Sequence, residues 1–248
     1  MMNPIRGVLF DLDGTLVDSI DLIVACFDHT YHTHLGATLP RERIVATIGR
    51  PLIEALEDAA PGRGSELFVT YGAFNDAHHD DLLRPYPAAL DAARALHARG
   101  LPLGVVTSKR RAGARRALRL YDVDALFPVL VALEDTQRHK PAPDPLLEGA
   151  RRLGLAPADT LYVGDSVYDV RAAQAAGMPV AAVLWGAGTA GELRALTPDL
   201  LLAEPGELLA APLQAPSTLG VALGALENEE TERDGQRADE RQRPDVRP

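Results

Sequence analysis

The sequence predicts an α/β protein with a Rossmann-like, doubly wound parallel sheet as its core and an inserted, all-helical cap. Short runs rich in Val, Leu and Ile recur along the chain without alternating with polar residues. Strands that are buried on both faces, as in parallel sheets, have this uninterrupted apolar pattern. Helix-like segments separate most of the runs, and this order favours a doubly wound sheet. About ninety residues separate the first run from the second, which leaves room for an inserted domain.

Six runs are predicted to be strands, and four other segments are predicted to be helices. The strands are Ile5–Phe10, Leu103–Thr107, Val129–Leu133, Thr160–Gly164, Val180–Trp185 and Leu200–Ala203. The helices are Ala88–Arg99, Ala112–Leu120, Asp144–Leu153 and Val167–Ala176. Gly100, Gly154 and Gly177 follow three of these helices, at the position where a glycine commonly ends a helix.

The domain organisation follows from this assignment. Residues 17–82 are predicted to be the helical cap, and residues 1–16 and 83–211 are predicted to form the core. Prolines at positions 40, 51 and 61 divide the cap into segments. The last 22 residues contain eight acids, five arginines and no aromatic residue. Such a segment cannot bury enough apolar surface to fold, so residues 212–248 are predicted to form a disordered tail.

Composition excludes several classes of protein. With 46% hydrophobic residues among 248, the chain is not disordered throughout, and its net charge of −10 argues against a nucleic-acid partner. The longest uncharged apolar stretch, 177–191, is interrupted and too short to span a membrane. A single cysteine, Cys26, excludes an internal disulfide and a cysteine zinc cluster. With no signal-peptide pattern at the N-terminus, we expect a cytoplasmic monomer or homodimer without a membrane partner.

Chemically active side chains follow four of the predicted strands. Ligands of parallel α/β sheets bind at the carboxyl ends of the strands, so we expect these side chains to converge at one edge. They are Asp11 and Asp13 after the first strand, Thr107 and Ser108 after the second, Lys140 in the loop after the third, and Asp165 and Asp169 after the fourth. Each residue alone is a weak signal, whereas the set at four strand ends is a strong one.

Asp11 and Asp13 are two residues apart, so they point to the same side of an extended backbone. Two carboxylates this close need a cation or a shared proton to coexist. The pair therefore indicates a metal-assisted nucleophile and an acid/base, although acids at a strand end also cap the following helix. Gly14 would let a backbone amide approach a substrate anion closely.

The remaining motifs each have a functional and a purely structural interpretation. Thr107 and Ser108 either cap the next helix or donate hydrogen bonds to an anion. Lys140 is either a surface residue or a required compact charge, and it is one of only two lysines among 25 basic residues. Asp165 and Asp169 lie one helical turn apart and share a face, where Mg²⁺ would take carboxylate ligands.

Together these residues predict phosphoryl transfer to a carboxylate. Asp11 attacks phosphorus and forms an aspartyl-phosphate, while Asp13 protonates the leaving oxygen and then deprotonates the hydrolytic water. Mg²⁺, Lys140 and the hydroxyls of Thr107 and Ser108 would neutralise the remaining phosphate oxygens.

The same residues resemble the haloacid dehalogenase superfamily. The match covers about residues 5–205, and the helical insert is similar to the type-1 cap of that family. Four segments of this chain are similar to the four motifs of that superfamily, in the same order. They are Asp11-Leu12-Asp13-Gly14-Thr15, Thr107, Lys140, and Gly164-Asp165-Ser166 with Asp169. The resemblance implies a Mg²⁺ ion held by the Asp11 carboxylate, the Asp13 main-chain carbonyl and Asp165. It also implies that Asp169 orients the metal shell or adds a ligand.

Differences among members of the superfamily narrow the reaction. Dehalogenases lack an acid at the position of Asp13, so Asp13 argues against dehalogenation. Sugar-phosphate mutases typically have Glu-Asp where this chain has Gly164-Asp165, so a mutase is a weaker alternative. The runs at 84–87 and 48–52 resemble phosphoglycolate phosphatases, whereas those at 132–141 and 182–185 resemble the related inorganic pyrophosphatases.

We therefore expect a Mg²⁺-dependent phosphatase of a small phosphorylated metabolite, most similar to phosphoglycolate phosphatases. Inorganic pyrophosphatase is the first alternative, and a sugar-phosphate mutase and a non-catalytic binding protein are weaker ones. Arg50 of the cap is expected to bind a substrate carboxylate or second phosphate, although a solvated arginine is the simpler interpretation. The histidines between positions 29 and 34 lack a familiar zinc spacing, so no zinc site is expected there.

Overall fold

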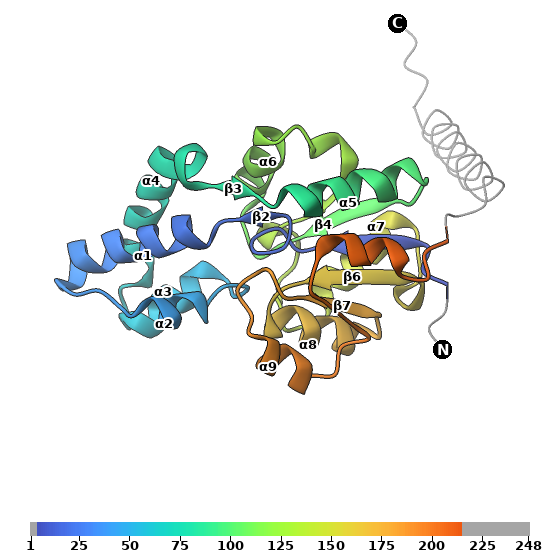
Figure 1. Ribbon diagram of the computed structural model, residues 1–248. Coiled ribbons are helices and arrows are strands. Elements are labelled where there is room, and N and C mark those ends of the chain that lie inside the picture. The colour runs from blue at the N-terminus through green and yellow to red at the C-terminus, as the bar shows by residue number, and fades with distance from the viewer. Residues whose placement is uncertain (1–3, 215–248) are drawn as a thin grey trace, which may run out of the picture. The chain divides into compact units, whose positions relative to one another are not determined.

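A sheet of six parallel strands forms the core of the computed structural model, which describes residues 4–214 (Figure 1). The strands are β1 Gly7–Phe10, β4 Leu103–Val106, β5 Val129–Val131, β6 Thr160–Gly164, β7 Val180–Val183 and β8 Leu200–Leu202. They lie in the order β5-β4-β1-β6-β7-β8, and every neighbouring pair is parallel. All six predicted strands are present, and the predicted α/β class is confirmed.

Helices cover both faces of this sheet. They are α5 Pro87–Ala98, α6 Arg111–Leu120, α7 Asp144–Leu153 and α8 Val167–Ala176. Val8 and Phe10 of β1 belong to the hydrophobic cluster that includes α5 and α6, whereas Leu9 belongs to the cluster that includes α7 and α8. Figure 1 shows α5 and α8 on opposite sides of the sheet. Because alternate side chains of each strand are buried on opposite faces, the strands carry the uninterrupted apolar runs seen in the sequence.

Shorter elements complete the core. The helix α9 spans Ala190–Ala195 between β7 and β8. Short 3₁₀ turns are η1 Asp124–Leu126, η2 Leu133–Asp135, η3 Pro157–Asp159 and η4 Pro205–Ala210. The helices α7 and α8 have the predicted bounds and end at left-handed glycines, Gly154 with φ of 70° and Gly177 with φ of 65°.

The position of β1 in the middle of the sheet decides where a ligand binds. From β1 the chain adds β4 and β5 on one side, and it then returns to add β6, β7 and β8 on the other. The loops that follow β1, β4 and β6 therefore diverge at one point of the carboxyl edge. In open α/β sheets this topological switch point is the usual ligand site.

Four helices of the long insertion between β1 and β4 form the cap, and they lie between β2 Val17–Asp18 and β3 Arg84–Pro85. They are α1 Ile20–Leu35, α2 Arg41–Val45, α3 Leu52–Ala59 and α4 Gly64–Leu82. Pro40 and Pro51 directly precede α2 and α3, as the sequence predicts. Phe27 of α1 packs edge-to-face on Tyr71 of α4, with ring centroids 5.3 Å apart, and Cys26 is buried beside them. Cap and core belong to one compact unit, so the domain limits at residues 17 and 82 stay a prediction.

One short element between the core and the cap was not predicted from the sequence. A short antiparallel ribbon, β2 Val17–Asp18 with β3 Arg84–Pro85, joins the two points where the chain leaves and re-enters the core. Two-residue strands are too short to carry a hydrophobic period, so the sequence does not predict them.

The predicted tail begins too early. The Ile5 amide donates a hydrogen bond to the Pro212 carbonyl at 3.0 Å, and the Gln214 amide donates to the Ile5 carbonyl at 2.7 Å. Residues 212–214 are therefore bound to the segment before β1. The rest of the predicted tail, 215–248, lies outside the described residues.

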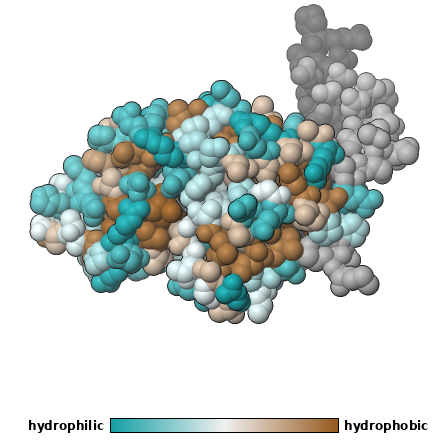
Figure 2. All heavy atoms as spheres, in the orientation of Figure 1, coloured by the Kyte–Doolittle hydropathy of each residue, from teal (hydrophilic) through white to brown (hydrophobic). Residues whose placement is uncertain are grey.

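The face of the molecule seen in Figure 2 mixes hydrophilic and hydrophobic residues over both the cap and the sheet. The cap helices show this mixture because only one face of each is turned inward. None of the helices within residues 4–214 is long and apolar enough to cross a membrane.

Candidate active site

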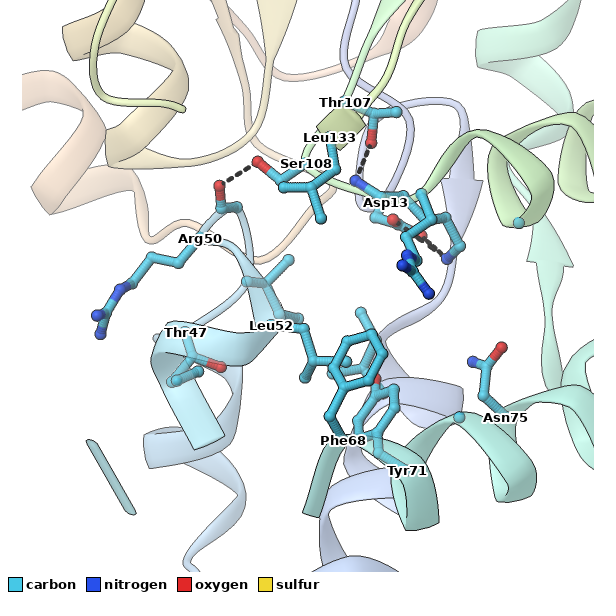
Figure 3. Close-up of a pocket in the computed structure, with 18 of the residues that line it drawn as sticks. Asp13, Thr47, Arg50, Leu52, Phe68, Tyr71, Asn75, Thr107, Ser108 and Leu133 are labelled. Carbon is cyan, nitrogen blue, oxygen red and sulfur yellow. Dashed lines mark hydrogen bonds and ion pairs between the residues drawn. The ribbon is translucent and has the colours of Figure 1, made fainter. Parts of the chain in front are cut away.

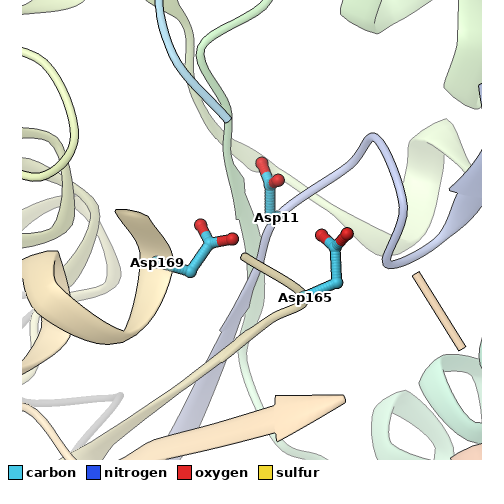
Figure 4. Close-up of side chains that lie close together, drawn as sticks. All are labelled: Asp11, Asp165 and Asp169. Carbon is cyan, nitrogen blue, oxygen red and sulfur yellow. The ribbon is translucent and has the colours of Figure 1, made fainter. Parts of the chain in front are cut away.

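Three buried aspartates from separate segments meet at the carboxyl edge of the sheet. Asp11 directly follows β1, Asp165 directly follows the neighbouring strand β6, and Asp169 lies in the first turn of α8. One carboxylate oxygen of each lies within 4.8 Å of the others, and Figure 4 shows the three groups facing a common space. Asp11 is 3% exposed and the other two are fully buried. The structure thus brings together three of the acids that the sequence placed at this edge.

One ammonium group, that of Lys140, faces these carboxylates. Its Nζ lies 3.0 Å from Asp11 Oδ1 and 2.7 Å from Asp169 Oδ1. Lys140 is 3% exposed, so the alternative of a surface lysine is wrong. Burial alone would lower the pKa of Lys140, but Asp11 and Asp169 outweigh it and raise the pKa above its ordinary value.

The site carries more negative than positive charge, because three carboxylates share one ammonium. Burial, opposed by Lys140 and reinforced by Asp169, raises the pKa of Asp11 to about 7. Burial and the charges of Asp169 and Asp11 hold the pKa of Asp165 well above its usual range. A further cation among these groups would favour their ionised forms.

Asp169 is bound to its neighbours through both carboxylate oxygens. Its Oδ1 accepts a hydrogen bond from Lys140 at 2.7 Å and lies 3.0 Å from the Tyr162 hydroxyl. Its Oδ2 accepts hydrogen bonds from the Ser166 amide at 3.0 Å and the Ser166 hydroxyl at 2.6 Å. Asp169 therefore orients Lys140 and caps the start of α8, and its oxygens are less available to a metal than those of its two neighbours.

The donor set fits Mg²⁺. Asp11 Oδ1 is buried and contacts the Lys140 ammonium at 3.0 Å without a well-aligned hydrogen bond, so the carboxylate of Asp11 retains lone pairs for a cation. Each carboxylate oxygen of Asp165 accepts one hydrogen bond from the described residues. Oδ1 accepts from the Thr15 hydroxyl at 3.1 Å, and Oδ2 accepts from the Ala187 amide at 2.7 Å. Hard oxygen ligands of this kind suit Mg²⁺. Asp11 and Asp165 are the side chains that would hold it, and Asp13 enters the expected ligand set through its main-chain carbonyl.

Gly14 has a different role from the expected one. Its amide donates a hydrogen bond to the Val17 carbonyl at 2.8 Å, so that amide is not available to a substrate anion. Its φ is 86°, and a Cβ atom on it would lie 2.2 Å from Asp165 Oδ2. Only glycine tolerates this conformation and this contact. Gly14 therefore lets the loop after β1 approach Asp165.

Asp13 is paired with Lys109, a residue that the sequence analysis did not include in the site. Lys109 Nζ donates hydrogen bonds to Asp13 Oδ1 at 2.9 Å and Oδ2 at 3.2 Å. Burial would raise the pKa of Asp13, but the Lys109 ammonium outweighs it and lowers the pKa below its usual value. The signal was present in the sequence, because Lys109 and Lys140 are the two lysines of the chain and both lie beside motifs.

Thr107 and Ser108 have separate roles. Thr107 Oγ1 accepts a hydrogen bond from the Lys109 amide at 3.2 Å, so its own proton remains available for a phosphate oxygen. The Ser108 hydroxyl instead donates to the Gly49 carbonyl of the cap at 2.8 Å. The expected anion contact of Ser108 is therefore not present, because its proton is used to join the core to the cap.

Arg50 also differs from the expectation. Its guanidinium donates a hydrogen bond to Asp58 at 2.9 Å and lies 3.8 Å from Glu54. Figure 3 shows its side chain extending away from Asp13. A role for Arg50 in substrate binding stays a prediction without support from these contacts.

A cavity of about 320 Å³ lies between the core and the cap. Asp11, Asp13 and Thr107 line it on the side of the core, and residues of α1, α3 and α4 line it on the side of the cap. Figure 3 shows Leu52 and Phe68 projecting into this space. The catalytic candidates thus line a partly open cavity of the size that small-molecule sites have.

Comparison with known proteins agrees with this geometry. Residues 8–183 match the family of haloacid dehalogenase-like hydrolases. The pyrophosphatase PpaX of Anoxybacillus flavithermus is 38% identical over 205 residues, which are 83% of this chain and 95% of that protein. The PpaX of Halalkalibacterium halodurans is 36% identical over the same shares of both chains.

Solved structures show the same relationship. A Bacteroides fragilis protein, provisionally named a haloacid dehalogenase-like hydrolase, has a TM-score of 0.78 and 30% identity over 82% of this chain and 99% of its own. A Lactobacillus plantarum protein, provisionally named a phosphoglycolate phosphatase, has a TM-score of 0.76 and 25% identity over 85% and 99% of the two chains.

Replacing the buried ammonium should destabilise the protein. Lys140→Met keeps the length of the side chain but leaves the carboxylates without their counter-charge, and we expect a loss of about 3 kcal/mol or more in the free energy of unfolding. Urea unfolding in EDTA at neutral pH measures this loss, and added Mg²⁺ should restore part of it. Lys109→Met is the control. Its partner Asp13 is partly exposed, so loss of this ion pair should lower the free energy of unfolding less. Equal stability of Lys140→Met and the wild type in EDTA would contradict the assignment.

Binding of Mg²⁺ should depend on pH. The pKa of Asp11 in the folded protein, about 7, lies above that of the unfolded chain. The contribution of Asp11 to stability is thus present at low pH and lost as the pH rises through about 7. Mg²⁺ must displace this proton, so it should raise the thermal midpoint more at about pH 8 than at about pH 6. The variant Asp11→Asn should lose this difference, and a wild-type effect independent of pH would oppose the assignment.

Proposed function

The chain belongs to the haloacid dehalogenase-like hydrolase family, and from that premise we propose that it is a Mg²⁺-dependent phosphatase that forms an aspartyl-phosphate on Asp11. One observation carries the proposal. The Asp11 carboxylate lies in the cavity, 3.0 Å from the buried Lys140 ammonium and beside the carboxylate of Asp165. A buried carboxylate held this way has the position and the charge environment of a nucleophile.

Asp11 is the member of the aspartate trio that lines the cavity. The carboxylate of Asp11 has two oxygens, so one is available for attack on phosphorus while the other would hold Mg²⁺. Bound Mg²⁺ would supply positive charge to the phosphate oxygens. Lys140 favours the ionised form of Asp11 and neutralises charge that develops on the phosphoryl group.

Asp13 is placed to move protons on the side of the leaving group. It also lines the cavity, and Lys109 favours its ionised form, which is the form that accepts a proton from the hydrolytic water. In the first half-reaction Asp13 must instead donate a proton. The negative charge of a bound phosphate would raise its pKa toward that role, so the two half-reactions use the same carboxyl in opposite directions.

The substrate is a small phosphate compound, and two specific candidates have support. The runs at 48–52 and 84–87 resemble phosphoglycolate phosphatases, which supports a phosphomonoester. The curated relatives named pyrophosphatase PpaX, 38% and 36% identical to this chain, support inorganic pyrophosphate as the second candidate. Phosphate release from 2-phosphoglycolate, pyrophosphate, hexose phosphates and nucleotides separates them. Turnover that needs an added bisphosphate would indicate a mutase, and no turnover of any compound would indicate a binding protein.

Asp11→Asn should lower kcat by more than about 10³-fold, because the amide cannot form the covalent intermediate. The carboxyl and amide have nearly the same shape, so the far-ultraviolet circular dichroism should be unchanged. Phosphate release from acetyl phosphate with Mg²⁺, compared with EDTA, measures the effect on a small activated substrate. A variant that retains wild-type turnover would remove Asp11 from the role of nucleophile.

Asp13→Asn should slow poor leaving groups more than good ones. An alkyl alkoxide needs a proton as it leaves, whereas p-nitrophenolate does not, so the loss should be about 10²-fold or more for ethyl phosphate. The loss for p-nitrophenyl phosphate should be much smaller. Single-turnover rates of both esters give the comparison, and equal losses would count against the acid role.

A further inference from the structure

The cap side of the cavity is mostly apolar. It is formed by side chains of α1, α3 and α4, and Leu133 of the core extends it. Its larger apolar residues are Ile23, Phe27, Leu52, Ala55, Phe68 and Tyr71, and its polar residues are Thr47, Arg50, Asn75 and Asp76. Figure 3 shows Leu52, Phe68 and Tyr71 on the side of the cavity opposite Ser108.

The cations that line the cavity are already paired. Lys109 lies 2.9 Å from Asp13, and Arg50 lies 2.9 Å from Asp58. The guanidinium carbon of Arg110 lies 5.3 Å from the centre of the Phe68 ring, within cation–π distance. Among the described residues that line the cavity, none offers an unpaired cation to a second anionic group.

We propose that the group esterified to the phosphate is apolar, so that the substrate is the phosphate monoester of an aliphatic or aromatic alcohol. This inference rests on the proposed function, because it concerns the leaving group of the same reaction. It keeps the phosphatase chemistry and replaces 2-phosphoglycolate and pyrophosphate as the expected substrates. A carboxylate or a second phosphate placed against Leu52 and Phe68 would lose its hydration without gaining a partner. An alkyl or aryl group in that place gains from removal of its surface from water.

The volume of the cavity agrees with a leaving group of modest size. The cavity of about 320 Å³ lies at the lower end of the range of small-molecule sites, which suits a phosphate together with a small organic group. Pyrophosphate would also fit by volume. The apolar character of the wall, and not the size of the cavity, therefore favours an alkyl or aryl phosphate over pyrophosphate.

A series of n-alkyl phosphates tests the proposal. Methyl, ethyl, butyl and hexyl phosphate differ little in the basicity of the leaving alkoxide, so a change in kcat/KM along the series reports burial of the chain. We expect kcat/KM to rise by about twofold to fourfold per methylene until the cavity is full. Hexyl and phenyl phosphate should exceed both pyrophosphate and 2-phosphoglycolate in kcat/KM.

Variants of the wall connect this preference to named residues. Phe68→Ser should lower the ratio of kcat/KM for hexyl phosphate to that for methyl phosphate by about tenfold, and Leu52→Ser tests the same wall from another helix. Val69→Ser is the matched control, because Val69 follows Phe68 on α4 but is 70% exposed and does not line the cavity. This control should leave the ratio unchanged.

The outcomes separate this inference from the proposed function. A flat alkyl series, or a higher kcat/KM for pyrophosphate than for hexyl phosphate, would overturn the apolar leaving group. If acetyl phosphate is still hydrolysed in a reaction that needs Mg²⁺ and Asp11, the phosphatase assignment survives that result. Loss of acetyl phosphate hydrolysis as well would overturn both. A ratio that changes as much in Val69→Ser as in Phe68→Ser would also overturn it, because the effect would not come from the wall.

Discussion

The rest of the structure depends on the burial of three carboxylates around one ammonium. Asp11, Asp165 and Asp169 come from three segments, and each is almost completely removed from water. Such a cluster is costly unless its charges are compensated. Lys140 compensates part of the charge, and the raised pKa of Asp11 shows that the compensation is incomplete. The chemistry of the cluster therefore fits a further cation.

The sheet topology makes this cluster possible. Because β1 lies between β4 and β6, the loops after these strands reach the same edge from opposite directions. Asp11 and Asp165 extend from neighbouring strands. Gly14 has no Cβ atom, so the loop after β1 can approach the Asp165 carboxylate closely. The same arrangement leaves Asp13 on the outer side, toward the cap, where it meets Lys109.

Core and cap contribute different properties to the cavity. The core supplies the carboxylates of Asp11 and Asp13 and the ammonium of Lys109, whereas most of the cap side of the cavity is apolar. A direct hydrogen bond from Ser108 to the Gly49 carbonyl joins the two parts next to Thr107.

The sequence by itself determined the fold class, the order of the strands along the chain and the segments that carry the site. Those features depend on local periodicity and on residues next to strand ends, such as Asp11 after β1 and Asp165 after β6. The ribbon of β2 and β3, the Lys109–Asp13 pair, the hydrogen bond of Ser108 to the cap and the ion pair of Arg50 with Asp58 were decided only by the tertiary structure. Each of these contacts depends on which partner lies within about 3 Å in space. Except for Asp58, which is eight residues from Arg50, the partners are tens of residues apart along the chain, and no sequence pattern specifies them.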